Sequence, residues 1–581
     1  MALFTPSESP AIVVREIDLS GVVPNVQSTT GAMVGNFRWG PVEQATLIDN
    51  EGNLAANFGT PDDTTAVDFI SAGYFLKYSN SLQIIRGVDA LASNASISAS
   101  PLVTQPLVKN DNHFDIQLSA LDSDSVDMIA KYPGALGNSL KISSCLYSAD
   151  NVAFEGDGNP GTEWAYMSSF DAAPGTSVFA TAKGASNDEV HVVIVDEDGL
   201  ISGTKGSVLE TFPFLSIASN AKKEDGSTNY VVDVINARSR YIKLVNVLSL
   251  SSTAGVEAED GVDFDASVVL ATTSSFVNGV NSGALTTANY ATGFDLFADK
   301  DTIQVDFLIA PGMSARVDQT TIVNYMVGLA QETRKDCIVV TSPARTDIVS
   351  SITPVTDAVT TANTFTSSSY LVVDNNYLKV YNKYADKYVH IPAASSIAGL
   401  MAATDLNSGP WFSPAGARRG NLLGVTALAY SPTKSERDTL YKAGINPIAN
   451  LPGQGVLLFG DKTKLMRPSA FDRINVRRLF LTLERAIAIA ARNSLFEFND
   501  EFTRAEFVNI VEPFLREIKG RRGITDFKVV CDETNNTAAV IDRNEFIASI
   551  FIKPARSINY ITLNFVAVRT GVDFEEIAGT V

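Results

Sequence analysis

The segment VDFLIAPGMSARVDQTTIVNYMVGLAQETRKDCIVVT, residues 305–341, decides the fold. It opens with the apolar run Val305 to Ile309 and closes with the run Cys337 to Thr341, and both have the length and β-branched content of buried strands. The interval Thr321 to Lys335 carries apolar residues at helical spacing, namely Val323, Tyr325, Met326, Leu329 and Ala330. Strand, helix and strand at this spacing predict a βαβ unit with parallel pairing.

The same α/β character is predicted nearer the N-terminus. Within residues 31–88, Asp63 to Lys77 has apolar residues at roughly helical spacing, and Leu82 to Arg86 is a short strand pattern. Together they predict an α/β unit. The chain has 581 residues. Since one hydrophobic core rarely exceeds about 250–300 residues, roughly three to four domains are expected.

Residues 90–296 differ in composition, because Ser, Thr, Gly, Asn and Asp are frequent and helical periodicity nearly vanishes. Short β patterns such as Val190 to Val195 and Leu200-Ile201 are separated by turn signals. The pair Asp198-Gly199 between these two patterns predicts a hairpin. This interval is therefore predicted to hold one or two all-β domains inserted into the α/β core.

The C-terminal part is the most helical. An apolar stripe from Val476 to Leu495 predicts one helix. A second helix is predicted to open with a capping box of Thr503 and Glu506 and to kink at Pro513. Strands are predicted at Asp526 to Cys531, Phe546 to Ile552 and Tyr560 to Val568.

The first twenty residues combine an arm rich in Pro and Ser with a strand pattern. From Ile12 to Leu19 the side chains alternate between two faces, one of them largely apolar, which predicts a half-buried strand. A strand so near a terminus, preceded by a flexible arm, can pair with its own chain or with another. The residues themselves leave both pairings open.

Charge and cysteine content argue against several classes of function. A net charge of −20 repels phosphate and anionic lipid, so neither direct nucleic-acid binding nor membrane-surface binding is expected. Cys145, Cys337 and Cys531 lie far apart without a CxxC pair, which predicts isolated buried thiols, without a metal site or a disulfide framework. The N-terminus lacks a signal-peptide pattern, and no apolar run approaches the roughly 20 residues of a membrane span, so a soluble protein is expected.

Residue types that carry catalysis are scarce. The chain has only three histidines, His113, His191 and His390, and a Ser-His-Asp triad needs one of them beside a nucleophile. No matching motif surrounds them, and no P-loop is present. No catalytic residue, cofactor or metal is therefore predicted.

The C-terminal part also carries a basic cluster. Almost all of the negative net charge lies in residues 1–460, whereas Arg516, Lys519, Arg521 and Arg522 gather at the end of the second predicted helix. Cations at a helix C-terminus complement the helix dipole and add to solubility. The alternative is a basic surface that docks on an acidic partner.

Several strings, in the same order along the chain, resemble the contractile phage tail sheath family. They are Val14 to Ser20, Tyr132-Pro133-Gly134, Gly409 to Gly420, Ala443 to Ile448, and a dense match from Ile474 to Ala555 that includes Phe496-Glu497-Phe498-Asn499-Asp500. The chain has Pro10-Ala11 where the family more often has Pro-Gly. The resemblance covers residues 10–90 and 300–581 well, and residues 90–300 poorly.

The resemblance implies an α/β core of subtilisin-like topology without a catalytic triad, with inserted all-β domains and an α+β C-terminal domain. The implied divisions are residues 1–20 for an arm and exchanged strand, 21–90 and 297–459 for the two parts of the core, 91–296 for the outer β-rich insertion, and 460–581 for the inner, tube-facing C-terminal domain with its own exchanged strand.

The resemblance also implies a structural subunit, not an enzyme. Such subunits polymerise as stacked six-fold rings in a helical stack around an inner tail tube, and contract to drive the tube through the host envelope for genome delivery. The implied partners are further copies of the chain, the tail tube protein, and the baseplate and tail terminator proteins, without cofactor, nucleic acid or membrane insertion. The implied location is the virion tail, assembled in the host cytoplasm. A headless phage-tail-like injection particle, a β-rich adhesin and a subtilisin-fold hydrolase are the alternatives.

In the family, an N-terminal arm and a C-terminal strand join a sheet in a neighbour's C-terminal domain. The positions thereby implied for strand exchange between subunits are Ile12, Val14, Glu16, Ile17, Leu19, Tyr560, Leu563, Phe565 and Val566. An ordinary edge strand within one chain is the alternative for both segments. The candidate tube contact is the basic cluster Arg516, Lys519, Arg521 and Arg522.

Overall fold

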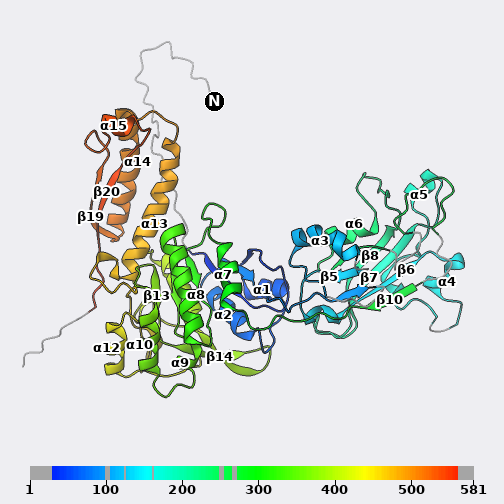
Figure 1. Ribbon diagram of the computed structural model, residues 1–581, viewed down its shortest axis with the longest axis horizontal. Helices are drawn as coiled ribbons and strands as arrows, with labels where there is room; N and C mark the ends of the chain where they lie inside the picture. Colours follow the sequence, from blue (N-terminus) through cyan, green and yellow to red (C-terminus); the bar gives the residue numbers. More distant parts are fainter. Residues whose placement is uncertain are drawn as a thin grey trace, which may run out of the picture. The chain divides into compact units, whose positions relative to one another are not determined.

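The computed structural model describes residues 29–98, 105–123, 126–159, 162–247, 254–264 and 271–559. Within these residues the chain forms two compact units, a large unit of residues 29–410 and 414–485 and a small unit of residues 411–413 and 486–559. Figure 1 labels many of the elements of both. The division falls between Arg485 and Ala486, and the domain boundaries expected from the sequence stay predictions.

The centre of the large unit is a six-stranded sheet in the order β13-β12-β11-β1-β3-β2. Neighbouring strands run parallel, except that β2 is antiparallel to β3 at the edge. The predicted βαβ unit is confirmed, because β11 and β12 pair in parallel and flank the helix α8. The bounds are β1 (Gly31–Gly35), β2 (Thr46–Ile48), β3 (Leu82–Arg86), β11 (Phe307–Ile309), β12 (Ile338–Thr341), β13 (Leu371–Val373) and α8 (Arg316–Gly328).

Helices cover both faces of this sheet. Ile338 and Val340 of β12 face one apolar core, and Val339 between them faces the other. This two-sided burial is why the strands are continuous apolar runs. The first core includes α2 (Ala66–Leu76) and α11 (Ala394–Asn407), and the second includes α7 (Thr287–Asp295), α8 and α10 (Pro354–Thr364). The α/β core is thus observed, whereas its subtilisin-like topology stays a prediction.

Smaller elements complete the large unit around the main sheet. They are α1 (Glu51–Phe58), α9 (Arg345–Ile348), α12 (Lys434–Lys442), β14 (Tyr377–Asn382), β15 (Lys387–Pro392), β16 (Ala427–Leu428), β17 (Ile448–Leu451) and β18 (Gly455–Leu458). The predicted helix from Thr321 to Lys335 begins earlier, at Arg316, and continues beyond Gly328 as a π-helical turn to Arg334.

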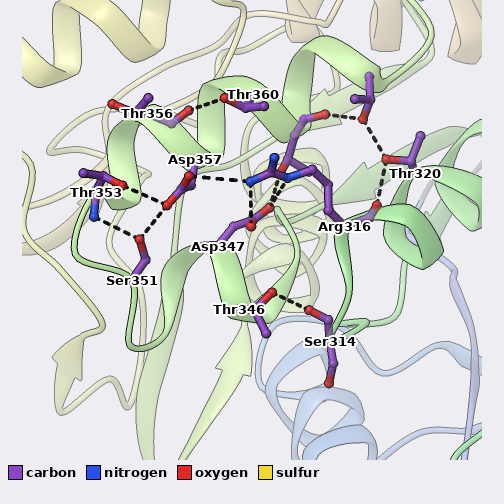
Figure 2. A network of polar contacts seen from close by, with 12 residues as sticks. Ser314, Arg316, Thr320, Thr346, Asp347, Ser351, Thr353, Thr356, Asp357 and Thr360 are labelled. Carbon is purple, nitrogen blue, oxygen red and sulfur yellow. Dashed lines mark hydrogen bonds and ion pairs between the residues drawn. The ribbon is translucent and has the colours of Figure 1, made fainter.

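A polar network joins the helices of the second core at their surface (Figure 2). Arg316, the first residue of α8, donates from Nε and Nη2 to the two carboxylate oxygens of Asp347 in α9, at 2.9 and 2.8 Å. It also lies 3.5 Å from Asp357 of α10, which accepts hydrogen bonds from Ser351 and Thr353. Because a bidentate arginine fixes both distance and angle, this network sets α8, α9 and α10 relative to one another.

Asp374, directly after β13, is a buried acid without a basic partner in the hydrogen bonds described around it. Its carboxyl group accepts hydrogen bonds from Ser342 Oγ at 2.8 Å and from the Asn376 N–H at 2.9 Å. Burial raises the pKa of Asp374 to about 8, although the two hydrogen bonds act in the opposite direction. The carboxyl group is therefore largely protonated in the folded protein at neutral pH.

Replacing this acid with its amide, Asp374→Asn, is expected to make unfolding less dependent on pH. The folded pKa of about 8 exceeds the ordinary value of 3.8, so stability falls as pH rises between these values. The advantage of the variant should grow by about 1.4 kcal/mol per pH unit over that range and stay constant above it. Urea unfolding from pH 4 to 9 measures this. Asp357→Asn is the control, because hydrogen bonding from Ser351 lowers the pKa of Asp357. A pH-independent difference would contradict the prediction.

The insertion is not all-β, so that prediction is wrong. Antiparallel sheets are present in the orders β10-β6-β7-β8 and β4-β5-β9, but helices lie between their strands. Helix α3 escaped prediction because only Phe114 and Leu121 among its described side chains are buried, which is too narrow an apolar stripe to show periodicity. The bounds are β4 (Ser96–Ser98), α3 (Asp111–Ser123), β5 (Val126–Ala130), β6 (Leu140–Leu146), α4 (Val152–Glu155), α5 (Val178–Lys183), β7 (Glu189–Asp196), β8 (Ser207–Ser216), α6 (Val231–Arg238), β9 (Ile242–Leu244) and β10 (Ala271–Ser275).

The hairpin predicted at Asp198-Gly199 is confirmed only for its first strand, because Leu200-Ile201, predicted as the second strand, lies in the turn. Strands β7 and β8 pair antiparallel, and residues 197–206 connect them. The buried carboxylate of Asp196 accepts hydrogen bonds from the N–H groups of Gly199, Leu200, Ile201 and Ser202 at 2.6–3.1 Å. The Asp196 carboxylate thus accepts hydrogen bonds from the backbone N–H groups of the turn, which would otherwise need partners on the opposite strand.

A buried arginine joins the insertion to the main sheet. Arg86, at the end of β3, is 1% exposed and donates to the carbonyl oxygens of Phe37, Gly40 and Pro133 at 2.8, 2.9 and 2.7 Å. Next to Pro133, the ring of Tyr132 meets Trp39 edge-on at 5.4 Å. The Tyr132-Pro133-Gly134 string is thereby explained as the docking point of the insertion on the core.

Candidate assembly interface

The small unit is built on α14 (Glu501–Gly520), with the strands β19 (Ile524–Val530) and β20 (Ser549–Pro554) and the short helix α15 (Ala538–Ile541). Helix α13 (Ile474–Ala491) begins in the large unit and ends in the small one. Along α14 the buried residues Phe507, Val511, Leu515 and Ile518 form an apolar stripe. Pro513 lies inside the helix, on its exposed side.

The predicted capping box at Thr503 is wrong. The residue before α14 is Asp500, whose side chain accepts a hydrogen bond from the Thr503 N–H at 2.8 Å. Aspartate is among the preferred N-cap residues because its carboxylate satisfies a free amide of the first turn. The helix therefore starts at Glu501, and Thr503 lies inside it.

Strands β19 and β20 form a two-stranded antiparallel sheet, in which Phe527 lies opposite Ile552 and Val529 opposite Ile550. Each strand has one edge that pairs with no other strand among the described residues. The sheet is also poorly covered, since the Phe551 side chain is 60% exposed. A two-stranded sheet is marginal by itself, and unpaired N–H and C=O groups are a template for a further strand. Both edges can therefore accept strands from other chains through main-chain hydrogen bonds.

Residues 495–502, which comprise the segment after α13 and the first residues of α14, expose a mainly aromatic surface, called the aromatic surface below. The side chains of Leu495, Phe496, Phe498 and Phe502 are 61%, 105%, 84% and 77% exposed. Phe496 has φ = 69°, a left-handed conformation that bulky residues rarely adopt. Asn499 holds the segment in place, donating to the Glu545 carbonyl at 2.8 Å and accepting from Arg504 at 2.9 Å. An ordered apolar surface of this kind is typical of an interface.

The sequence analysis does not predict the aromatic surface as a functional feature, although Phe496 to Asp500 is part of the family resemblance. The available signal was the alternation of aromatic and acidic residues outside any helical stripe, as in Phe496-Glu497-Phe498. Periodicity alone does not tell a buried aromatic residue from an exposed one when the segment lies between two helices.

The basic cluster at the end of α14 is interleaved with carboxylates. Lys519 pairs with Asp526 at 3.0 Å, and hydrogen bonding to Lys519 lowers the pKa of Asp526. The nearby pairs Arg516–Glu512 and Arg521–Glu517 measure 3.5 and 3.6 Å. Because exposed pairs contribute only about 0–1 kcal/mol each, these side chains can exchange partners at little cost. The structure thus gathers the four predicted residues at one helix end, and their contact with a tube stays a prediction.

Trp411 anchors this helix end. It is 8% exposed, and its indole N–H donates to the Arg521 carbonyl oxygen at 3.1 Å. The Arg521 guanidinium lies 4.9 Å from the indole ring, a cation–π distance. A residue more than a hundred positions away in sequence thereby holds Arg521, one member of the basic cluster, in place.

The strand-exchange positions lie outside the described residues. This holds for Ile12, Val14, Glu16, Ile17 and Leu19 at one end of the chain and for Tyr560, Leu563, Phe565 and Val566 at the other. Their role stays a prediction, and the described part of the small unit contributes the open sheet that could receive them.

Among the described residues, no group of three His, Cys, Asp or Glu side chains is placed to hold a metal, and no helix is both long and apolar enough to cross a bilayer. His191 accepts a hydrogen bond at Nδ1 from the Phe214 N–H, and its Nε2 bonds the Ala172 carbonyl oxygen, so neither nitrogen meets a nucleophile. Cys145, Cys337 and Cys531 are buried free thiols, as predicted.

The chain is similar to phage tail sheath proteins in sequence. The family model described as the phage tail sheath protein central domain matches residues 283–464, and the one described as the phage tail sheath C-terminal domain matches residues 467–567. The tail sheath protein of Vibrio phage KVP40 is 32% identical over 693 aligned residues, which cover 98% of this chain and 99% of that protein. The tail sheath protein of Enterobacteria phage T4 is 33% identical over 658 aligned residues, with 98% and 99% covered.

Solved structures show the same fold at lower identity. A sheath tail protein from Listeria innocua matches with a TM-score of 0.55 and 13% identity, covering 92% of this chain and 93% of that one. A sheath tail protein from Desulfitobacterium hafniense matches with a TM-score of 0.52 and 11% identity, covering 94% and 100%.

Proposed function

The chain belongs to the phage tail sheath protein family, and from this premise we propose that it polymerises as stacked six-fold rings around an inner tail tube. It is a structural, non-enzymatic subunit of a contractile tail sheath. Contraction of the stack would drive the tube through the host envelope and deliver the genome. In this proposal the subunit assembles in the host cytoplasm and ends in the virion tail.

The open β19–β20 sheet carries this proposal. Among the described residues this sheet has two unpaired edges. Neighbouring subunits can donate two strands, one from residues 12–19 and one from residues 560–568, so each edge can receive one. Pairing through main-chain hydrogen bonds holds copies together while each subunit rotates as a rigid body. A contact in which one copy donates and the next receives is head-to-tail, so it can generate a closed ring or, where the rotation does not close, a helical stack.

The other partners are proposed from the basic cluster of α14 and from the open strand edges. The basic cluster Arg516, Lys519, Arg521 and Arg522 is proposed to contact the tail tube protein, exchanging its present carboxylate partners for acidic groups of the tube. The first and last rings of the stack would have unfilled strand edges, which we assign to the baseplate and tail terminator proteins.

Purified full-length protein, expressed without any other tail component, is expected to form long hollow cylinders. Negative-stain electron microscopy measures this directly, and sedimentation gives the mass distribution of the same sample. Strand donation needs only copies of one chain, so no tube is required for polymers to appear. Protein that stays uniformly monomeric at high concentration would contradict the proposal.

A further inference from the structure

The insertion contains a surface cavity of about 760 Å³, widely open to solvent, that the sheath function leaves unexplained. One wall comes from residues 147–155, including α4, which Figure 1 labels, and the other wall comes from residues 167–175. Small-molecule sites in proteins usually enclose about 300–1,000 Å³. The cavity thus has the size of a ligand site, and all its lining residues lie within the insertion.

The apolar side of the cavity includes the ring of Phe170, whose position is fixed by its neighbours. Phe170 is half-exposed and stacks on the His191 ring at 4.3 Å with an interplanar angle of 7°. On the same stack, Trp164 lies 5.3 Å from Phe170 at 25°. His191 in turn is fixed through both ring nitrogens, by Phe214 and Ala172. Phe170 therefore lines the cavity as a ring that its two stacking partners hold in place.

The wall formed by residues 147–155 contains two consecutive residues in the left-handed conformation, Asp150 and Asn151, both with φ = 55°. Apart from glycine, aspartate and asparagine are the residues that adopt this conformation most readily. Asn151 lines the cavity, so its amide group is available at the edge.

The polar lining offers both hydrogen-bond donors and acceptors. Asn151, Tyr147 and Ser168 can donate, and the exposed carboxylates of Glu155 and Asp171 can only accept. A cationic ligand needs acceptors alone, and a purely apolar ligand needs neither. A ligand that uses the whole set has several hydroxyl groups and one apolar face.

We propose that this cavity binds a neutral saccharide. The C–H face of a sugar ring would stack on Phe170, while adjacent hydroxyl groups bond the carboxylates of Glu155 and Asp171 and the amide of Asn151. This is a binding function additional to assembly of the sheath, and it depends on none of the strand-exchange residues. The same site fits a free oligosaccharide and the exposed end of a cell-surface polysaccharide.

Saturation-transfer NMR on the full-length protein tests this proposal. The probes are maltotriose, chitotriose, mannotriose and lactose at millimolar concentration, with tetramethylammonium chloride as a cationic probe and whole bacterial polysaccharide as the surface-bound form. Transfer to ring C–H protons of at least one saccharide is expected. Asp171→Ala and Glu155→Ala should each weaken binding about tenfold, as expected for one lost hydrogen bond to a charged group.

The matched control is Glu224→Ala, which removes an exposed carboxylate of the insertion outside the cavity. All three variants change exposed side chains, so unchanged thermal unfolding checks that they remain folded. The proposal is overturned if no saccharide shows transfer, if tetramethylammonium alone binds, or if the two cavity variants bind as well as the control. Cylinder formation is scored on the same samples, so loss of binding is separable from loss of assembly.

Discussion

A chain carrying both Val14→Pro and Ile17→Pro is expected to fold and to form no cylinders. Proline lacks the N–H group that a strand donates to its neighbour. Successive amides along a strand point to opposite edges, so one even and one odd position remove a donor from each edge. Electron microscopy and sedimentation should show monomers or short rings where the unchanged chain forms long polymers.

The matched control for this experiment is Val14→Thr with Ile17→Val, which keeps β-branched side chains and both amides. It is expected to polymerise normally. The thermal unfolding of the proline variant, which does not polymerise, distinguishes pairing with another copy from pairing within the chain. If residues 12–19 pair with another copy, the prolines leave the unfolding temperature of the monomer unchanged, whereas pairing within the chain predicts a lower one. Ordered cylinders from the proline variant would refute strand donation by this segment.

Replacing Arg86 with methionine is expected to lower the free energy of unfolding by about 3–5 kcal/mol, since a buried group left without its hydrogen bond costs about 1–3 kcal/mol. The guanidinium satisfies the buried carbonyl oxygens of Phe37, Gly40 and Pro133. Methionine fills much of the same volume and donates no hydrogen bond. The lower free energy of unfolding therefore comes mainly from the lost hydrogen bonds, and less from a cavity. Urea unfolding is best measured on the chain that carries the two prolines, because polymerisation would otherwise add to apparent stability.

Arg38→Met is the control for Arg86→Met. It removes the same charge beside the docking point, since the Arg38 carbonyl oxygen lies 3.4 Å from Arg86 Nη2, and the Arg38 side chain is half-buried instead of enclosed. Its expected loss is below about 1 kcal/mol, the usual range for such surface positions. Equal losses for the two variants would mean that Arg86 does not hold the insertion. The Arg86 variant should also become more sensitive to protease cleavage between the core and the insertion.

Much of the α/β core was predictable, because the residues that form each element are adjacent in sequence. The strand at Ile338–Thr341 and the helix ending near Arg334 are marked by apolar runs and by helical spacing. Prediction failed where one side chain redirected the chain. Asp500 moved the start of α14 away from Thr503, and Asp196 lengthened the turn at Asp198-Gly199. Helix α3 was missed because its polar surface leaves little periodicity.

The candidate interface, like the core, was predictable only in part. Sequence order and family strings pointed to the terminal segments and to the basic cluster of α14. They did not show that Glu512, Glu517 and Asp526 pair with that cluster, or that Phe496 and Phe498 are exposed. Exposure depends on which elements come to lie beside a segment, and local spacing does not contain this information.

By itself, the sequence determined the βαβ core, the position of the long C-terminal helices and membership of the sheath family, because each depends on residues close together or in a fixed order. Only the tertiary structure decided that Arg86 donates to the Pro133 carbonyl oxygen, that Trp411 meets Arg521, that Asp374 is a buried acid, and that Phe170 lines a cavity. These relations join or enclose segments far apart along the chain, so they exist only once packing has brought those segments together.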